Sequence, residues 1–276
     1  SSLDKYSKPE QLFYTDNQDR YLAYWPKKYD GPKNTLQSRN SLIGNFTETW
    51  TTNLVQEAVK DLGYHAVQGA VCKELALSPR SNADVIISKK KGVQQKPEDI
   101  LLIFEVKMSI VWNWQYKPEN KELVNLGDYT THQGNPGMLR SDSMLKAIGK
   151  SLNIRVSDPR ANNVPIIVIG NTPINKSYYS KVDHLKEAGI VQGFWSVNPQ
   201  PLDDGKDSIK NTKKNGFYRF DAEQDFKNKV HSFLKEELSF FSSMKSKKEL
   251  GRIIQVANQK ESLEEKAQEF LRLLNQ

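Results

Sequence analysis

The chain has 276 residues, of which 37% are hydrophobic and 26% are charged, a composition that permits a globular protein with a sizeable core. No apolar run approaches the roughly 18 residues of a membrane helix, and we expect no signal segment at the N-terminus. The single cysteine, Cys72, favours a reducing cytoplasm. The net charge of +7 favours a polyanionic partner, although many basic proteins bind no nucleic acid.

The first part of the chain is predicted to contain an arm and a long helix. Residues 1–40 are rich in Tyr, Lys, Asn and Pro without a sustained period, so we expect little regular structure there. Over residues 44–62 apolar side chains recur at helical spacing, and Gly63 is a stop signal. Two adjacent apolar stripes are formed by Phe46, Trp50, Leu54 and Ala58 and by Val55, Val59 and Leu62. Glu48 shares the side of the second stripe.

Two buried strands follow a short strand predicted near residues 65–71. The apolar runs 84–87 and 101–107 are bounded by Lys, Gly and Pro, as buried strands commonly are. Because side chains alternate along a strand, Glu105 and Lys107 point to one face and their apolar neighbours to the other.

Acidic groups are expected to gather at the ends of these two strands. Asp84 and Glu105 would converge from adjacent strands, and two carboxylates make an oxygen site for a hard divalent cation. Lys107 beside them could orient a water molecule or help to deprotonate it. The alternative is a strand end whose glutamate and lysine are simply solvated.

The centre of the chain continues with alternating helices and strands. We predict a helix over residues 139–154, a fully buried parallel strand over 164–170, a helix over 178–188 and a strand over 190–197. Helix, three strands, helix, strand, helix, strand is the order of an α/β sandwich. Such a fold has a mixed central sheet with helices on both faces.

The C-terminal region is predicted to be helical after a loop that begins at Asn198. Asp221 caps one amphipathic run, and Ser262 with Glu265 has the pattern of a capping box. The apolar stripe of the last segment comprises Leu250, Ile253, Ile254, Phe270, Leu271 and Leu274. This stripe could close the core or meet another subunit. We therefore divide the chain into an N-terminal arm (1–40), a catalytic α/β core (41–200) and a C-terminal helical region (201–276).

Several enzyme classes lack their sequence signals. The four histidines are scattered and have no H-E-x-x-H spacing, which leaves zinc hydrolysis unsupported. The chain has no G-x-x-x-x-G-K-[ST] loop and no G-x-G-x-x-G after a strand, which argues against an ATP-driven or dinucleotide-dependent enzyme. Acidic strand ends, an adjacent lysine, a basic chain and an α/β order agree with metal-assisted cleavage of a phosphodiester.

The order and spacing of these residues resemble the core of PD-(D/E)xK nucleases. Ala83-Asp84 stands for the P-D pair, and Glu105-Val106-Lys107 stands for E-x-K. This resemblance implies a nuclease-like sandwich with Mg²⁺ as the cofactor, Asp84 and Glu105 as its ligands, and Lys107 as a catalytic residue. It covers roughly residues 44–197.

A second resemblance concerns the helix predicted after the catalytic strand. Residues 138–144 are similar to the R-[ST]-D-R signature of type II restriction endonucleases that read CCGG-containing sites, but Ser143 replaces the final arginine. Arg140 can donate two hydrogen bonds to guanine, and Asp142 can accept one from cytosine. Lys146 is also assigned to DNA recognition, and Lys150 to weak, salt-sensitive contacts with phosphates. Alternatively, Arg140 and Asp142 cap and charge an ordinary helix.

These resemblances together imply a type II restriction endonuclease that cuts double-stranded DNA with Mg²⁺ in a prokaryotic cytoplasm. An early helix of such nucleases often carries a glutamate that reaches the metal site. Glu48 is our candidate, Glu57 is the rival position, and an exposed helix glutamate is the alternative. Two active sites are needed to cut a palindrome, which implies a homodimer or higher homo-oligomer. A repair nuclease or junction resolvase of the same fold, and a non-catalytic DNA-binding module, remain as alternatives.

Overall fold

The computed structural model describes residues 8–33, 37–197, 209–235, 238–239 and 245–276, and its centre is a six-stranded sheet. The strands lie in the order β10 (Phe217–Arg219), β9 (Gly193–Ser196), β8 (Ile166–Gly170), β5 (Ile100–Lys107), β4 (Ala83–Ser88) and β3 (His65–Ala70). Strands β3, β4 and β5 are antiparallel, whereas β5, β8, β9 and β10 are parallel. The α/β class and the mixed sheet predicted from the sequence are therefore confirmed.

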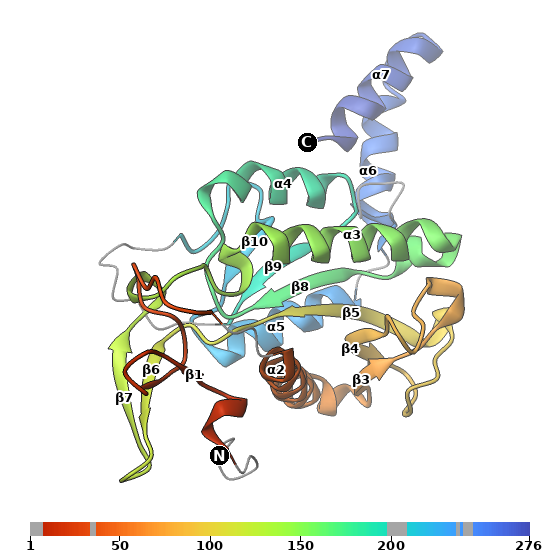
Figure 1. Cartoon of the computed structure of the whole chain (residues 1–276). Coiled ribbons are helices and arrows are strands. Elements are labelled where there is room, and N and C mark those ends of the chain that lie inside the picture. The colour runs from red at the N-terminus through yellow and green to blue at the C-terminus, as the bar shows by residue number, and fades with distance from the viewer. Residues whose placement is uncertain (1–7, 34–36, 198–208, 236–237, 240–244) are drawn as a thin grey trace.

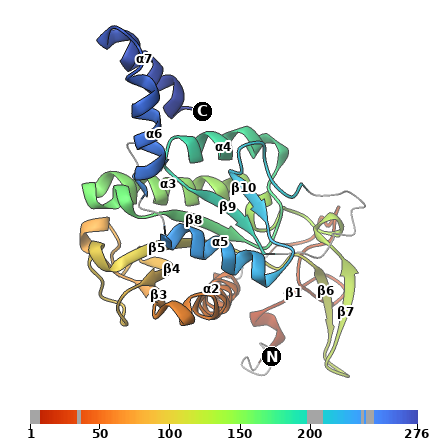
Figure 2. The ribbon, with the colours of Figure 1, turned by 180° about the vertical axis from the view of Figure 1, so that it is seen from behind.

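Helices cover both faces of this sheet (Figures 1 and 2). One face is covered by α2 (Gln37–Val59) and α5 (Glu223–Lys235), and the other by α3 (Ser141–Ser157) and α4 (Tyr179–Glu187). Helix α2 begins earlier than predicted and continues as a 3₁₀ turn, Lys60–Leu62. This turn ends as predicted at Gly63, whose left-handed φ of 74° is one that glycine adopts without a steric penalty.

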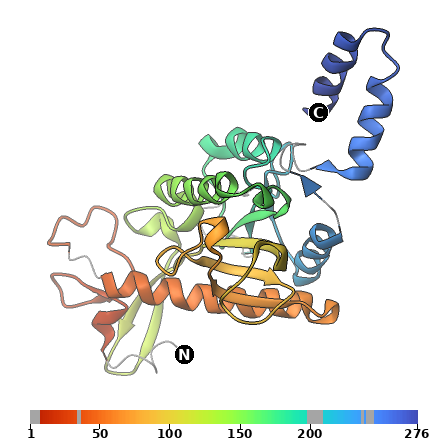
Figure 3. The ribbon, with the colours of Figure 1, turned by 90° about the vertical axis from the view of Figure 1, so that its right-hand side faces the viewer.

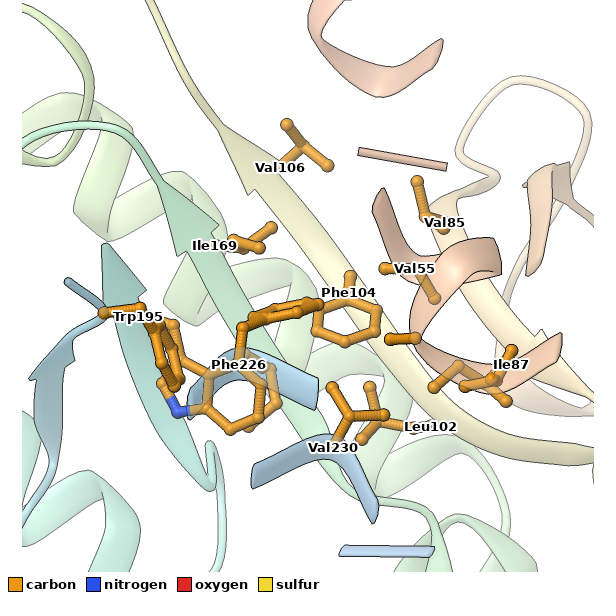
Figure 4. Packing of buried hydrophobic residues seen from close by; sticks show 14 residues of the cluster. Val55, Val85, Ile87, Leu102, Phe104, Val106, Ile169, Trp195, Phe226 and Val230 are labelled. Atoms are coloured by element: carbon orange, nitrogen blue, oxygen red, sulfur yellow. The ribbon is translucent and has the colours of Figure 1, made fainter. Parts of the chain in front are cut away.

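The sheet face toward α2 and α5 holds an aromatic and aliphatic core (Figure 4). Phe104 and Val106 of β5 point into this layer, where the ring of Phe104 lies 6.0 Å from that of Trp195 and 6.4 Å from that of Phe226. Burial of one such side chain contributes about 1.5–3 kcal/mol. Because side chains alternate along β5, this core directs Glu105 and Lys107 toward the layer that contains α3.

Helix α2 buries only part of the two predicted stripes: Ala58, Val55 and Val59 are buried as expected, whereas Leu62 is 37% exposed. Phe46 and Trp50 are 56% and 43% exposed, whereas Thr51, Val55 and Val59 are fully buried. Phe46 and Trp50 instead line a surface cavity, so they do not belong to the core. The prediction is wrong for these two residues, because their side chains lie on the side of α2 that lines the cavity and not on the side of Val55 and Val59.

A second, antiparallel sheet of four strands lies beside the first (Figure 1). Its strands are β1 (Tyr14–Thr15), β2 (Tyr21–Leu22), β6 (Asn113–Lys117) and β7 (Glu122–Gly127). The described part of the arm therefore contains two short strands where little regular structure was expected. Strand β2 pairs with β6, which follows the central strand β5 in the chain. The arm is thereby joined to the segment that follows strand β5.

A buried arginine from α2 holds the arm in place. Arg39 donates hydrogen bonds from Nε to the Leu12 carbonyl at 2.9 Å and from Nη2 to the Ala23 carbonyl at 2.5 Å. Its guanidinium also lies 4.7 Å from the ring centroid of Tyr14 and 5.1 Å from that of Tyr24, distances at which cation–π attraction contributes. These contacts stabilise strands that would be too short to persist alone.

The C-terminal region contributes both to the core and to a projection from it. Strand β10 pairs with β9, and Phe226 and Val230 of α5 are buried in the core, so the division predicted at residue 200 falls within the central fold. The loop predicted from Asn198 lies outside the described residues up to residue 208. A short ladder of β11 (Leu238–Ser239) and β12 (Lys245–Ser246) precedes α6 (Lys247–Ala257) and α7 (Leu263–Leu274).

Helices α6 and α7 form a hairpin that stands away from the body (Figure 3). The capping box predicted for α7 is confirmed, because the side chains of Ser262 and Glu265 each accept the other's backbone N–H. The exposed fractions of Ile254 and Leu271 are 49% and 56%. None of the described helices combines the length and the apolar character needed to cross a membrane.

His132, buried beside the arm, gives a test of this packing. Its ring stacks on that of Tyr24 at a centroid distance of 3.9 Å, and its burial lowers its pKa from the ordinary 6.5. The unfolded imidazole takes up a proton near pH 6.5 while the folded one resists it, so stability should fall as the pH drops below that value. The slope should be at most about 1.4 kcal/mol per pH unit for one proton.

The variant His132→Phe keeps a stacking ring but cannot be protonated. Urea titrations between about pH 5 and 8, a range that spans the ordinary histidine pKa, measure the free energy of unfolding of both proteins. Toward low pH this free energy should decrease less in the variant than in the wild type. Parallel curves for the two proteins would contradict this assignment.

Candidate active site at the ends of strands β4 and β5

The charged residues predicted from the two strands lie together. Asp84 is near the start of β4, and Glu105 and Lys107 are at the end of β5. The two strands are antiparallel, with Val85 opposite Phe104, so the start of β4 lies beside the end of β5. The sequence correctly placed these three side chains at one point of the sheet.

Three oxygen atoms surround the ammonium group of Lys107. Its Nζ lies 2.5 Å from Glu105 Oε1 and 3.9 Å from Asp84 Oδ2, and it donates a hydrogen bond to the Val106 carbonyl at 3.1 Å. Asp84 Oδ2 also accepts the Val106 N–H at 2.7 Å. The backbone of β5 thus fixes the orientation of the Asp84 carboxylate from the neighbouring strand.

A second ammonium group reaches the same carboxylates from helix α3. Nζ of Lys150 lies 2.9 Å from Asp84 Oδ1 and 2.6 Å from Glu105 Oε2. Lys150 was expected to make weak phosphate contacts, but its side chain is only 20% exposed and points into the cluster. The sequence does contain a signal that Lys150 lies on the buried side of α3. Lys150 is three residues after Ala147 and four before Ile154, and both of these residues are buried.

Burial and mutual repulsion shift the pKa values in this cluster. Burial raises the pKa of Glu105, and the nearby charge of Asp84 raises it further, against the opposite effect of the two lysines. Burial disfavours the charged form of Lys150, but the charges of Glu105 and Asp84 outweigh it and raise the pKa of the ammonium. Lys150 is therefore a cation held by two anions.

Glu48, from the middle of α2, lies at the margin of the cluster. Its Oε2 accepts a hydrogen bond from Gln68 Nε2 at 3.3 Å. Burial raises the pKa of Glu48, and the charge of Asp84 adds to the effect, so the two carboxylates interact. Glu57 instead forms an exposed ion pair with Lys60 at 2.5 Å. Of the two candidate glutamates, the fold brings Glu48 toward the strand ends.

The residues predicted to recognise DNA form an exposed group at the start of α3. Asp142 Oδ2 lies 3.4 Å from Arg140 Nη2 and 3.1 Å from Lys146 Nζ. Arg140 occupies the N-cap position but makes no capping hydrogen bond with its side chain, whereas Asp142 in the first turn is favourable for the helix dipole. Ser143 is half-buried next to them. One turn after Lys146, the same helix carries Lys150 into the cluster.

The oxygen atoms of the cluster suit a hard cation. Carboxylates of Asp84 and Glu105 and the Val106 carbonyl converge on one ammonium group, and oxygen is the donor that Mg²⁺ and Ca²⁺ prefer. Among the residues that the structure describes, no group of three or more His, Cys, Asp or Glu side chains could hold a metal ion. Mg²⁺ does not need such a cage, because it is commonly held by one or two carboxylates, with water and substrate phosphates completing its shell.

Comparison with known proteins identified no relative of this chain. No protein-family model, curated protein or solved structure matches the chain. Function must therefore be inferred from the side chains at the strand ends. Their most informative feature is that the carboxylates of Asp84 and Glu105 lie between two ammonium groups. Glu105 is only 5% exposed.

Proposed function

We propose that the protein is a Mg²⁺-dependent endonuclease of the PD-(D/E)xK type that cuts double-stranded DNA at a specific sequence, as type II restriction endonucleases do. The observation that carries the proposal is the convergence of Asp84, Glu105 and Lys107 at the ends of adjacent strands. Their order in the chain also resembles the motif of these nucleases. The mixed sheet between two helical layers is compatible with such a core.

Each residue of the cluster has a role in this reaction. Asp84 and Glu105 hold Mg²⁺, which when bound polarises a phosphoryl oxygen and stabilises developing negative charge. Lys107 positions the attacking water and stabilises charge on the phosphate. Glu48 supports the site from α2. Attack of water on phosphorus breaks the bond to the 3′ oxygen and leaves a 5′-phosphate and a 3′-hydroxyl.

Exposed charges supply the contacts with DNA. The net charge of +7 favours binding to the phosphate backbone through counterion release. Arg140, Asp142, Ser143 and Lys146 stand together at the start of α3, with Arg140 62% and Lys146 73% exposed. The first turn of a helix is where side chains commonly reach base edges in the major groove. These residues read a target that contains G·C pairs, with CCGG as the candidate core.

The first prediction from this proposal concerns the cluster itself. In the isosteric variants Asp84→Asn and Glu105→Gln, and in Lys107→Ala, cleavage of plasmid DNA with Mg²⁺ should fall below detection. Specific DNA binding should persist in the two carboxylate variants, because removal of an anion relieves repulsion of the phosphates. Glu48→Gln should slow cleavage by roughly 10- to 100-fold.

Glu57→Gln is the matched control for Glu48→Gln, since it changes an exposed glutamate of the same helix. Discrete bands from wild-type digestion mean site-specific cutting, a smear or preference for branched DNA means a repair nuclease or resolvase, and intact DNA that is merely bound means a binding module. Near wild-type turnover in any cluster variant would refute the assignment of the site.

The second prediction concerns the reading of bases. Arg140→Ala should weaken specific binding by tens-fold, because one good base contact contributes about 1–3 kcal/mol of discrimination. Non-specific, salt-sensitive binding should change little, since it depends on many scattered charges. Competition binding with a specific duplex and with unrelated DNA measures both. Equal losses for the two DNAs would exclude base reading by Arg140, and the nuclease assignment would stand.

The third prediction concerns assembly, because cutting both strands at a palindrome needs two active sites. The exposed apolar residues of the projecting hairpin, among them Leu263 at 85% and Leu271 at 56%, support a contact between two copies of the chain. Deletion of residues 247–276 should lower the mass measured by light scattering while the circular dichroism of the remainder is preserved. Leu271→Glu should act in the same way. If the truncated protein unfolds, the hairpin instead stabilises the core of the same chain.

A further inference from the structure

We infer that Lys150 is an internal counter-ion that holds the carboxylate pair in the DNA-free protein and must move away when a divalent cation binds. This inference rests on the proposed function and assigns to α3 a control over cation binding. The E-x-K motif does not include Lys150, and the residue lies on a different element from the two carboxylates.

Lys150 connects the two carboxylates. Its Nζ bridges Asp84 Oδ1 at 2.9 Å and Glu105 Oε2 at 2.6 Å, so one positive charge joins the two residues that would hold the cation. A divalent cation that shared these carboxylates would lie close to the ammonium in a poorly solvated place. Repulsion between like charges at such distances is strong, because the surrounding medium screens it weakly. The two cations therefore compete for the same oxygens.

Geometry indicates which of the two lysines is displaced. Lys107 is on the same strand as Glu105 and also donates to the Val106 carbonyl, so its position is fixed by β5 itself. Lys150 reaches the carboxylates across a layer boundary on a flexible four-carbon chain from α3. Rotation about its side-chain bonds can withdraw the ammonium without any change in the sheet. Lys150 is thus the movable charge and Lys107 the fixed one.

The position of Lys150 on α3 links this displacement to DNA. The start of the same helix presents Arg140, Asp142 and Lys146 to solvent. A DNA phosphate near the strand ends offers the ammonium of Lys150 another anionic partner, so bound DNA lowers the free energy needed to release it. Cation and DNA should then strengthen each other's binding, and such coupling is reciprocal.

Calorimetric titration of Mg²⁺ into the DNA-free protein tests the inference without turnover. At pH 8.5, where ordinary carboxylates are ionised, Lys150→Met should bind Mg²⁺ roughly tenfold more tightly or better than the wild type, because the competing charge is gone. Lys150→Arg, which keeps the charge, should resemble the wild type. Lys146→Met removes an exposed lysine one turn away and should leave the affinity unchanged. The variant Asp84→Asn/Glu105→Gln should bind no Mg²⁺ at this site.

A second measurement tests the link to DNA. The affinity of the wild type for a plasmid-derived duplex should rise markedly when Ca²⁺ replaces EDTA, and that rise should be several-fold smaller in Lys150→Met. If Lys150→Met does not fold, Lys150→Gln serves in both experiments, since it keeps a polar group without the charge.

The outcomes separate this inference from the proposed function. Equal, carboxylate-dependent Mg²⁺ affinities in wild type and Lys150→Met would overturn the counter-ion role, while plasmid cleavage by the wild type would leave the nuclease proposal intact. Weaker Mg²⁺ binding in Lys150→Met would also overturn it, because Lys150 would then support the cation site. Absence of Mg²⁺ binding in every variant, together with uncut plasmid, would refute both.

Discussion

The pairing of the buried Glu105 and the half-buried Asp84 with two ammonium groups is the interaction on which the rest of the structure depends. Leaving such a buried charge without its partner destabilises a protein by about 3–5 kcal/mol. Lys107 forms an ion pair with Glu105 from the same strand, and Lys150 forms ion pairs with both carboxylates from α3. This pairing constrains the β4–β5 register that sets Asp84 beside Glu105, and it constrains the docking of α3 over the same end of the sheet.

The opposite face of β5 imposes the same register by a different force. Phe104 and Val106 are buried in the core with Trp195 and Phe226. A slip of one residue would turn Glu105 and Lys107 into this apolar layer and Phe104 toward Lys150. Hydrophobic burial and ion pairing would then both be lost, so neither needs to specify the strand alone. Such agreement between independent forces is expected of a sequence that folds to one structure.

The parts of the fold that follow from local pattern could be predicted, and the parts that depend on distant contacts could not. Apolar runs and alternation identified β4 and β5 and brought Asp84, Glu105 and Lys107 together. The strands β1 and β2 have two residues each, too few for a period, and depend on Arg39, which is distant in the sequence. Lys150 has its Asp84 partner 66 residues away. Its place on the buried side of α3 was visible, but the charges opposite it were not.

Charge balance distinguishes this cluster from an ion pair that serves stability alone. Asp84, Glu105 and Glu48 are three carboxylates that interact with two ammonium groups. Burial is the main reason that the pKa of both glutamates is raised; the charge of Asp84 raises it further, and the two lysines act in the opposite direction. Carboxylates whose pKa values are perturbed by burial and by a neighbouring charge are concentrated at functional sites. The excess of carboxylates over ammonium groups at the strand ends, and not only the spacing of the motif, therefore supports the proposal of a cation-dependent enzyme.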